Sequence, residues 1–126
     1  MGLTVEDRLE ITELLARYNH AIDSGDAEAW AATFTKDGVF APPGATTEGR
    51  AELLAYAKRR YEPRKRHWTN NVVIEGDGDE ATMRCYLHVM LVGEPGLETM
   101  VTGRYSDRLR RIDGAWRFAR RDLEVD

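Results

Sequence analysis

The side chains of this sequence best suited to proton-transfer chemistry are Asp23 and His67. An imidazole exchanges a proton near neutral pH, and a carboxylate that holds one ring nitrogen leaves the other nitrogen free to act as a base. Two interpretations of Asp23 stay open. It faces water or bonds the Ser24-Gly25 turn, or it enters a cavity and holds an imidazole. His67 could likewise be a strand-end histidine without a chemical role.

Further candidates follow from the alternation of residues along the expected strands. In this phase His67 and Asn71 share one strand face, so both could point into the same cavity. His88 has Tyr86 and Met90 on its own face. That neighbourhood fits either a buried histidine with satisfied hydrogen bonds or a histidine in a pocket.

Signatures of metal and cofactor chemistry are missing from the sequence. It has no phosphate-binding glycine loop, dinucleotide fingerprint, HExxH helix or nucleophile elbow. The histidines are scattered at His20, His67 and His88, so we expect no metal site and no cofactor. Cys85 is the only cysteine and reads as a small core residue, which fits a reducing, cytoplasmic setting.

Length and charge narrow the class of protein. A chain of 126 residues with 42% hydrophobic residues predicts one soluble domain, 1–126, and no apolar run approaches the roughly 18 residues of a membrane span. The net charge of −4 argues against nucleic-acid binding. Six bases between Lys58 and Arg66 fit a solvated helix end and loop, or a rim that attracts an acidic substrate.

Three helices should position the first of these residues. Thr4 and Asp7 have the spacing of a helix cap, and Ser24-Gly25 ends that helix. Its apolar stripe consists of Ile11, Leu14, Leu15, Tyr18 and Ile22. Asp26 can cap a second helix, and a third spans about Arg50 to Tyr61. The inner face of the second helix would carry Trp30, Ala31 and Phe34.

The remainder of the chain predicts strands. Lys36-Asp37-Gly38 reads as a turn before a short strand at 39–41. From His67 onward the hydrophobic period is two, with long strands expected at 81–92, 100–111 and 115–123. Asp113-Gly114 is typical of a tight hairpin. Helices first and antiparallel strands after define the α+β class.

One strand predicts an assembly. Both faces of Tyr86–Val92 are largely apolar, whereas an antiparallel strand with one wet face alternates more cleanly. Because helices can cover only one face of the sheet, we expect a second copy of the chain to cover the other. The sequence therefore predicts a homodimer through the sheet face.

Several motifs together resemble the SnoaL-like domains of the nuclear transport factor 2-like superfamily. They stand, in the expected order, at 14–26 (LLARYNHAIDSGD), 34–40 (FTKDGVF), 66–71 (RHWTNN), 103–107 (GRYSD) and 114–121 (GAWRFARR). The resemblance implies a cone of three N-terminal helices packed on a curved antiparallel sheet, usually dimeric. Relatives of this kind include polyketide cyclases, scytalone dehydratase, a dehydrochlorinase, ketosteroid isomerase, limonene epoxide hydrolase and non-catalytic binding proteins.

The motifs are most similar to the dehydratase and dehydrochlorinase branch. There an aspartate that ends the first helix orients a histidine that begins a strand and acts as the base, and Asp23 and His67 match those positions. Asn71 matches the asparagine after the histidine, and His88 resembles the second pocket histidine of the dehydratase. Two tyrosines of the dehydratase are replaced, by Ile22 and near Pro42. This departure argues against scytalone itself as the substrate.

These observations lead to one hypothesis and one alternative. The hypothesis is a cofactor-independent lyase or isomerase for a small apolar cyclic substrate, with His67 as base and Asp23 orienting it. Tyr18, Asn71 and His88 could hydrogen-bond a developing oxyanion. The apolar wall would be formed by Trp30, Phe34, Phe40, Tyr86 and Met90. The alternative is a small-molecule binding or dimeric assembly module that uses the same fold without chemistry.

Overall fold

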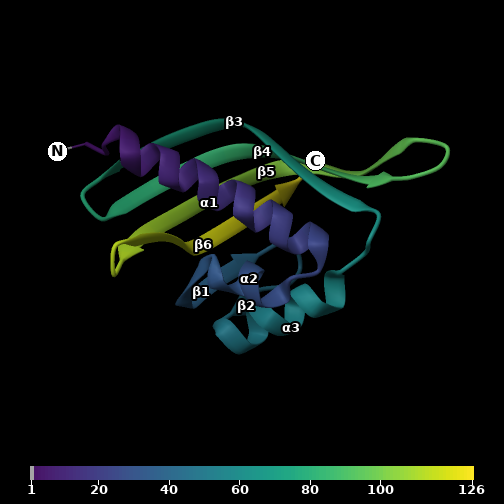
Figure 1. The fold of residues 1–126 in the computed structure, drawn as a ribbon, viewed down its shortest axis with the longest axis horizontal. Coiled ribbons are helices and arrows are strands. Elements are labelled where there is room, and N and C mark those ends of the chain that lie inside the picture. The colour runs from purple at the N-terminus through teal and green to yellow at the C-terminus, as the bar shows by residue number, and fades with distance from the viewer. Residues whose placement is uncertain (1) are drawn as a thin grey trace.

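The computed structural model describes residues 2–126 and shows helices lying across one face of a curved six-stranded sheet (Figure 1). This arrangement confirms the α+β class. The long helix α1 (Val5–Ser24) crosses the sheet, and α2 (Ala27–Ala32) and α3 (Arg50–Arg60) follow beyond its C-terminal end. Three helices are thus present, although α2 has only 6 residues.

The helix boundaries follow the capping residues. Thr4 Oγ1 accepts a hydrogen bond from the Asp7 N–H at 3.0 Å, and Asp7 Oδ2 accepts one from the Thr4 N–H at 3.0 Å. Gly25 ends α1 in the left-handed conformation, with φ of 80°. Asp26 then caps α2 by accepting a hydrogen bond from the Ala29 N–H.

The sheet has the strand order β2-β1-β6-β5-β4-β3. The strands are β1 (Phe34–Ala41), β2 (Thr47–Glu48), β3 (Lys65–Asp77), β4 (Glu80–Val92), β5 (Leu97–Ile112) and β6 (Ala115–Val125). All neighbours are antiparallel except β1 and β6, which run parallel. The expectation of a wholly antiparallel sheet is therefore wrong at this pair.

The segment around β1 differs from its prediction. Phe34 was expected on the second helix and 36–38 in a turn, but both belong to β1. Phe34 pairs with Phe118 of β6, and the register shifts before pairing resumes at Val39. The irregularity accommodates residues 36–38 inside β1. Their composition is typical of a turn, but it does not end the pairing with β6 here.

Two further irregularities decide which side chains face the helices. In β3 the register shifts between Asn70 and Val73, and Asn71 has a φ of 56°. In β6 pairing passes from Phe118 to Arg120, which turns Arg121 inward. Because a bulge changes the phase of every later residue, alternation read from the sequence fails beyond it.

The core is aromatic where α1, α2 and β1 meet. The ring centroid of Trp30 lies 5.4 Å from that of Tyr18, 5.1 Å from that of Phe34 and 5.7 Å from that of Phe40. Such tilted and edge-on pairs add about 0.5–1.5 kcal/mol beyond the area that they bury. The cluster fixes the C-terminal half of α1 against the sheet.

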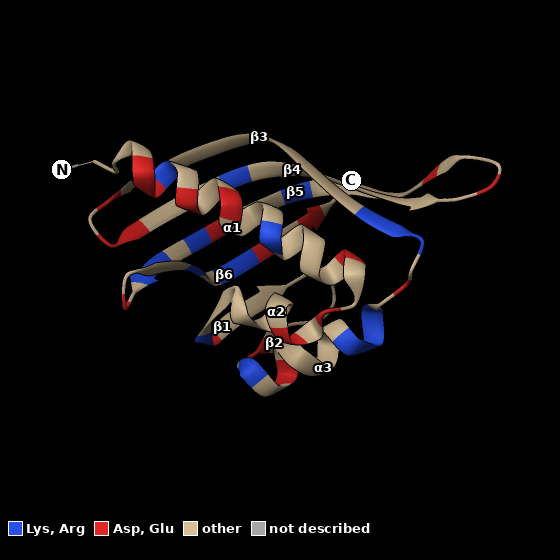
Figure 2. Cartoon of the chain, viewed as in Figure 1, with Lys and Arg blue, Asp and Glu red and all other residues tan. Residues whose placement is uncertain are grey.

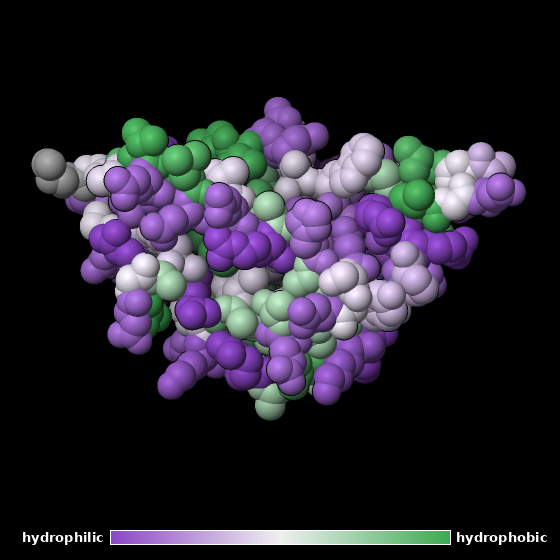
Figure 3. All heavy atoms as spheres, in the orientation of Figure 1, coloured by the Kyte–Doolittle hydropathy of each residue, from purple (hydrophilic) through white to green (hydrophobic). Residues whose placement is uncertain are grey.

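Charged and apolar residues are unevenly distributed on the surface. Lys and Arg gather at the end of α3 and the start of β3 (Figure 2). Hydrophobic residues gather along the sheet edge at β3 and towards the β4–β5 hairpin, whereas the face over α1 is largely hydrophilic (Figure 3). Among residues 2–126, no helix combines the length and the apolar character needed to cross a membrane.

Candidate functional site

A cavity of about 190 Å³ lies between the helices and the sheet. Its wall combines aromatic and aliphatic side chains, three of them tyrosines, with one histidine and two bases. The lining residues that the argument uses are Tyr18, Trp30, Arg60, Lys65, His67 and Tyr105. The volume is below the roughly 300–1,000 Å³ of pockets for drug-sized ligands, so the cavity suits a molecule of one or two rings.

His67 lines this cavity, and together with Asp23 it also lines a neighbouring hollow of about 520 Å³. His67 Nδ1 lies 2.6 Å from Asp23 Oδ1, and the His67 backbone N–H donates to Asp23 Oδ2 at 3.1 Å. Both side chains are largely buried, with exposed fractions of 14% for His67 and 16% for Asp23. The Asp23 carboxylate therefore holds the imidazole, although Asp23 itself is not among the residues that line the cavity.

This pairing determines the state of the ring. An ionised carboxylate can only accept hydrogen bonds, so Nδ1 carries the proton and Nε2 has a free lone pair in the neutral imidazole. Nε2 has no hydrogen-bond partner among residues 2–126, and His67 lines the cavity. The carboxylate sits at the C-terminal end of α1, where the helix dipole disfavours it. Its two hydrogen bonds to His67 offset that cost.

Three donors line the buried part of the cavity. Tyr18, Trp30 and Tyr105 are each at most 2% exposed. Burial raises the pKa of Tyr18 to about 12, and burial together with the neighbouring Tyr18 raises the pKa of Tyr105 well above 10. Trp30 Nε1 is buried and has no acceptor among the described residues. Two neutral phenols and an indole N–H therefore lie together in the buried part of the cavity, where Tyr105 and Trp30 also interact with the Tyr18 hydroxyl.

A buried ion pair stands behind the two tyrosines. Arg121 is fully buried, and it donates to Asp107 at 2.7 and 3.1 Å. Its guanidinium carbon lies 3.6 Å from the ring centroid of Tyr105 and 4.5 Å from that of Tyr18. The cation–π contacts hold the rings in place, and the Arg121 charge partly opposes the rise in the pKa of both tyrosines that burial causes. Arg121 does not line the cavity itself.

The structure brings together part of the set proposed from sequence. Tyr18, Trp30, Phe40 and His67 line the cavity. Phe34 is fully buried and packs behind this wall, with its ring centroid 6.0 Å from that of Tyr18. These residues come from α1, α2, β1 and β3, so the site is assembled by contacts between elements far apart in the sequence.

Four other candidates lie elsewhere. Asn71 is exposed because the β3 irregularity removes it from the face of His67. Tyr86 is 53% exposed, and it alternates with Leu87, which faces the cavity. His88 bonds Thr99 Oγ1 at 2.8 Å on the outer face of the sheet. Met90 is buried, but it lies outside both the main core cluster and the cavity lining.

Several lining residues were missed by the sequence reasoning. Tyr105 and Leu109 share one face of β5 and alternate with the polar Arg104, Ser106 and Arg108, and that alternation is a signal which could have placed Tyr105 inward. Arg60 and Lys65 belong to the basic run that was interpreted as a solvated helix end or an attracting rim. Cys85 is buried as expected, and burial raises the pKa of its thiol to about 11, which disfavours the thiolate form at neutral pH.

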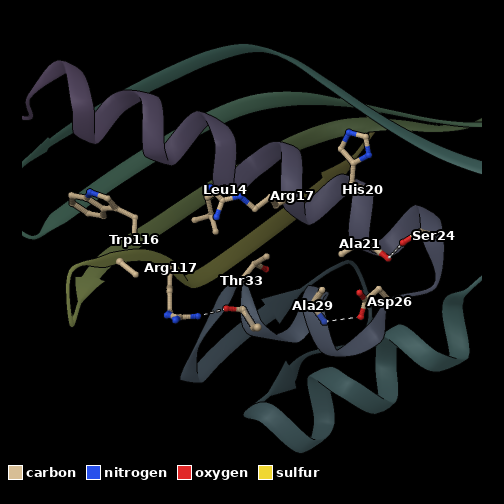
Figure 4. A pocket seen from close by; sticks show the side chains of 12 residues that line it. Leu14, Arg17, His20, Ala21, Ser24, Asp26, Ala29, Thr33, Trp116 and Arg117 are labelled. Carbon is tan, nitrogen blue, oxygen red and sulfur yellow. Dashed lines mark hydrogen bonds between the residues drawn. The ribbon is translucent and has the colours of Figure 1, made fainter.

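A second hollow of about 480 Å³ opens between α1, α2 and β6 (Figure 4). Its polar side chains make structural contacts: Asp26 caps α2, Ser24 donates to the Ala21 carbonyl, and Arg117 donates to the Ala32 carbonyl. His20 reaches this hollow but has no carboxylate holding its ring among the described residues. The larger hollow therefore offers no arrangement for proton transfer. Residues 2–126 also contain no cluster of three metal-ligating side chains.

Comparison with known proteins gives one family. Residues 3–122 match the SnoaL-like domain. The D26N form of Rv3472, a protein of unknown function from Mycobacterium tuberculosis, is 42% identical, with a TM-score of 0.87 over 94% of this chain and 70% of that chain.

Two further solved structures agree. A protein of unknown function with a cystatin-like fold from Nostoc punctiforme is 36% identical, with a TM-score of 0.91 over 100% of this chain and 96% of that one. An NTF2-like protein from Novosphingobium aromaticivorans is 33% identical, with a TM-score of 0.88 over 96% and 82% of the respective chains. No curated protein matches the chain.

Proposed function

Because the chain belongs to the SnoaL-like family, whose fold alone does not define a reaction, we propose its function from the cavity: a cofactor-independent lyase or isomerase. Its substrate is a small, largely apolar cyclic molecule. His67 removes a proton next to a carbonyl or a leaving group, and the anion then loses the leaving group or is protonated at another carbon.

The observation that carries this proposal is the contact of 2.6 Å between His67 Nδ1 and Asp23 Oδ1. This contact leaves Nε2 of His67 as the basic atom at the cavity. The Asp23 carboxylate also stabilises the imidazolium that forms when His67 takes up a proton. A positioned general base contributes about 10²–10⁴-fold to a rate. Most of the remaining acceleration must then come from substrate positioning and from stabilising the anion.

The buried donors supply that stabilisation. When a proton leaves the carbon next to a carbonyl, negative charge develops on the carbonyl oxygen. Tyr18, Trp30 and Tyr105 line the same cavity as His67, and both tyrosines stay protonated because burial raises their pKa. Donors in a water-poor site stabilise such an oxyanion more strongly than water does.

Solvent deuterium incorporation tests the proton-transfer step without knowledge of the natural substrate. Small cyclic ketones such as 2-tetralone are incubated with the protein in D₂O, and proton NMR follows exchange next to the carbonyl. We expect wild-type protein to accelerate exchange and His67→Ala to lower that acceleration about 10²–10⁴-fold. His88→Ala is the matched control, because His88 bonds Thr99 on the outer face of the sheet and lies outside this cavity.

Equal acceleration by the wild type and by His67→Ala would exclude His67 as the base. Saturable binding of the ketones with no exchange by any variant would instead favour the binding module that the sequence left as the alternative.

A further inference from the structure

Two basic side chains line the cavity at its exposed part. Arg60 is the last residue of α3 and Lys65 the first of β3, and both belong to the lining together with Tyr56. Arg60 is exposed and Lys65 is partly exposed, whereas the phenol and indole donors are buried. The cavity therefore has a cationic mouth and a neutral, donor-rich interior.

Neither cation is neutralised by the protein. Lys65 Nζ donates to the Arg60 carbonyl at 3.2 Å, and the Arg60 guanidinium lies 5.2 Å from the ring centroid of Tyr56. Among the described residues, no carboxylate comes within ion-pairing distance of either one. The neighbouring Arg64, in contrast, lies 3.6 Å from the Glu62 carboxylate.

A structural explanation accounts for only part of this arrangement. Cations in the last turn of α3 interact favourably with the helix dipole, which explains Lys58, Arg59 and Arg60 without any ligand. Lys65 lies on a strand, where the dipole offers no such explanation, and it still lines the cavity. The positive region is local, because the chain as a whole carries a net charge of −4 (Figure 2).

We propose that the ligand of this cavity is a small cyclic carboxylate whose anionic group is held by Arg60 and Lys65, with a hydrogen-bond acceptor such as a ketone directed to the buried donors. This inference rests on the proposed function, since it names the substrate class of the same cavity. Bidentate binding of a carboxylate suits the guanidinium of Arg60, and Lys65 adds a point charge.

Isothermal titration calorimetry with three matched probes tests the inference. The probes are 4-acetylbenzoate, its neutral amide 4-acetylbenzamide, and 4-ethylbenzoate, which lacks the acceptor. We expect 4-acetylbenzoate to bind about five- to tenfold more tightly than the amide, because its charge-assisted bonds form at a partly solvated mouth. It should also bind more tightly than 4-ethylbenzoate, and raising the salt concentration should reduce the preference for the anion.

Substitutions at the mouth locate the anion site. Arg60→Gln and Lys65→Gln should each reduce the preference for 4-acetylbenzoate over the amide, and the double variant should abolish it. Arg59→Gln is the matched control, because it removes the same charge from the same helix turn but does not line the cavity. The control should keep the wild-type preference.

Three results would overturn the inference. They are equal affinity for 4-acetylbenzoate and its amide, no saturable binding of 4-acetylbenzoate at millimolar concentration, and acetate binding as tightly as 4-acetylbenzoate. Equal affinities would leave deuterium exchange by His67 untouched, so the proposed function would survive. Anion-selective binding without exchange would support the inference and count against the proposed function.

Discussion

At the scale of single residues, the Asp23 carboxylate has two separable tasks. One oxygen accepts from the His67 backbone and fixes the start of β3, and the other orients the ring. In Asp23→Asn the amide oxygen can keep the backbone contact, but the charge that stabilises the imidazolium is lost. We expect deuterium exchange to fall about 10²–10⁴-fold, with little change in Tm.

Nitrogen NMR of the His67 ring provides a second measurement for this variant. The wild type should show a proton fixed on Nδ1, and Asp23→Asn a mixture of both tautomers. Wild-type exchange rates in the variant would mean that Asp23 holds β3 in place and nothing more.

Tyr105 tests the donor end of the cavity. Removing its hydroxyl in Tyr105→Phe should lower exchange about 10²–10³-fold, the usual effect of losing one oxyanion donor. Tyr61→Phe, outside the cavity, is the control. Ultraviolet titration checks the ionisation state. An ordinary tyrosine is half ionised at pH 10.0, whereas Tyr18 should stay protonated until the pH approaches about 12.

Because its raised pKa keeps the Tyr18 phenol neutral to a higher pH, ionisation of Tyr18 should not lower the rate of deuterium exchange between pH 8 and 10. A decline in that range which Tyr18→Phe removes would contradict the assigned state.

Sequence spacing placed Asp23 and His67 near element ends and left their roles open, and only the resemblance to SnoaL-like domains joined them as a pair. Spacing could not find Tyr105 or Arg60 as wall residues, since facing one cavity depends on how separate elements pack. Asn71 shows the opposite error: a bulge changed its face, and nothing in the local sequence specifies that bulge.

At the scale of elements, Asp7 connects the start of α1 with the distant β5–β6 hairpin. It accepts hydrogen bonds from the Thr4 N–H, from Trp116 Nε1 at 3.1 Å and from Arg111 Nη1 at 2.9 Å. These bonds, the Thr4 backbone bond above all, hold the pKa of Asp7 below its ordinary value of 3.8.

Because the pKa of Asp7 is lower in the folded protein than in the unfolded chain, the ionised Asp7 carboxylate stabilises the fold fully above pH 3.8. This stabilisation is lost as the pH falls through the pKa that Asp7 has in the folded protein. Asp7→Asn should therefore lower the Tm at pH 7, and its difference from the wild type should shrink below pH 3.8. Circular dichroism melts across this range measure both effects.

Asp79→Asn, which removes a more exposed partner of Arg111, should have a smaller effect at pH 7. A constant difference at all pH values would show that shape rather than charge matters at Asp7.

The caps and the Asp113-Gly114 hairpin were predictable because each depends on a few adjacent residues with defined backbone preferences. The two residues of β2 were not, because so short a strand has no period. The parallel pairing of β1 with β6 was not predicted either, since no local pattern states which distant strand a segment will join.

At the scale of the whole molecule, the face of the sheet opposite the helices is the surface through which we expect two copies of the chain to form a homodimer. Trp68 and Tyr86 alternate with less exposed residues of β3 and β4, and they are 57% and 53% exposed. Such a face is typical of an interface. We expect a homodimer at micromolar concentration in sedimentation velocity, and Tyr86→Arg should shift it to the 14.3 kDa monomer. Val5→Arg, at an exposed position on α1, should leave the mass unchanged. A monomeric wild type would refute the prediction.

The parallel pairing of Phe34 with Phe118 has a consequence for synthesis on the ribosome. Strand β1 can pair with β6 only after β6 has left the exit tunnel. Until then Trp30, Phe34 and Phe40 lack the strand beside which they pack, and their apolar rings are open to chaperones or to neighbouring chains. The elements that close the cavity are therefore made before the strand that fixes them, so a nascent chain should acquire ligand binding only after β6 has emerged.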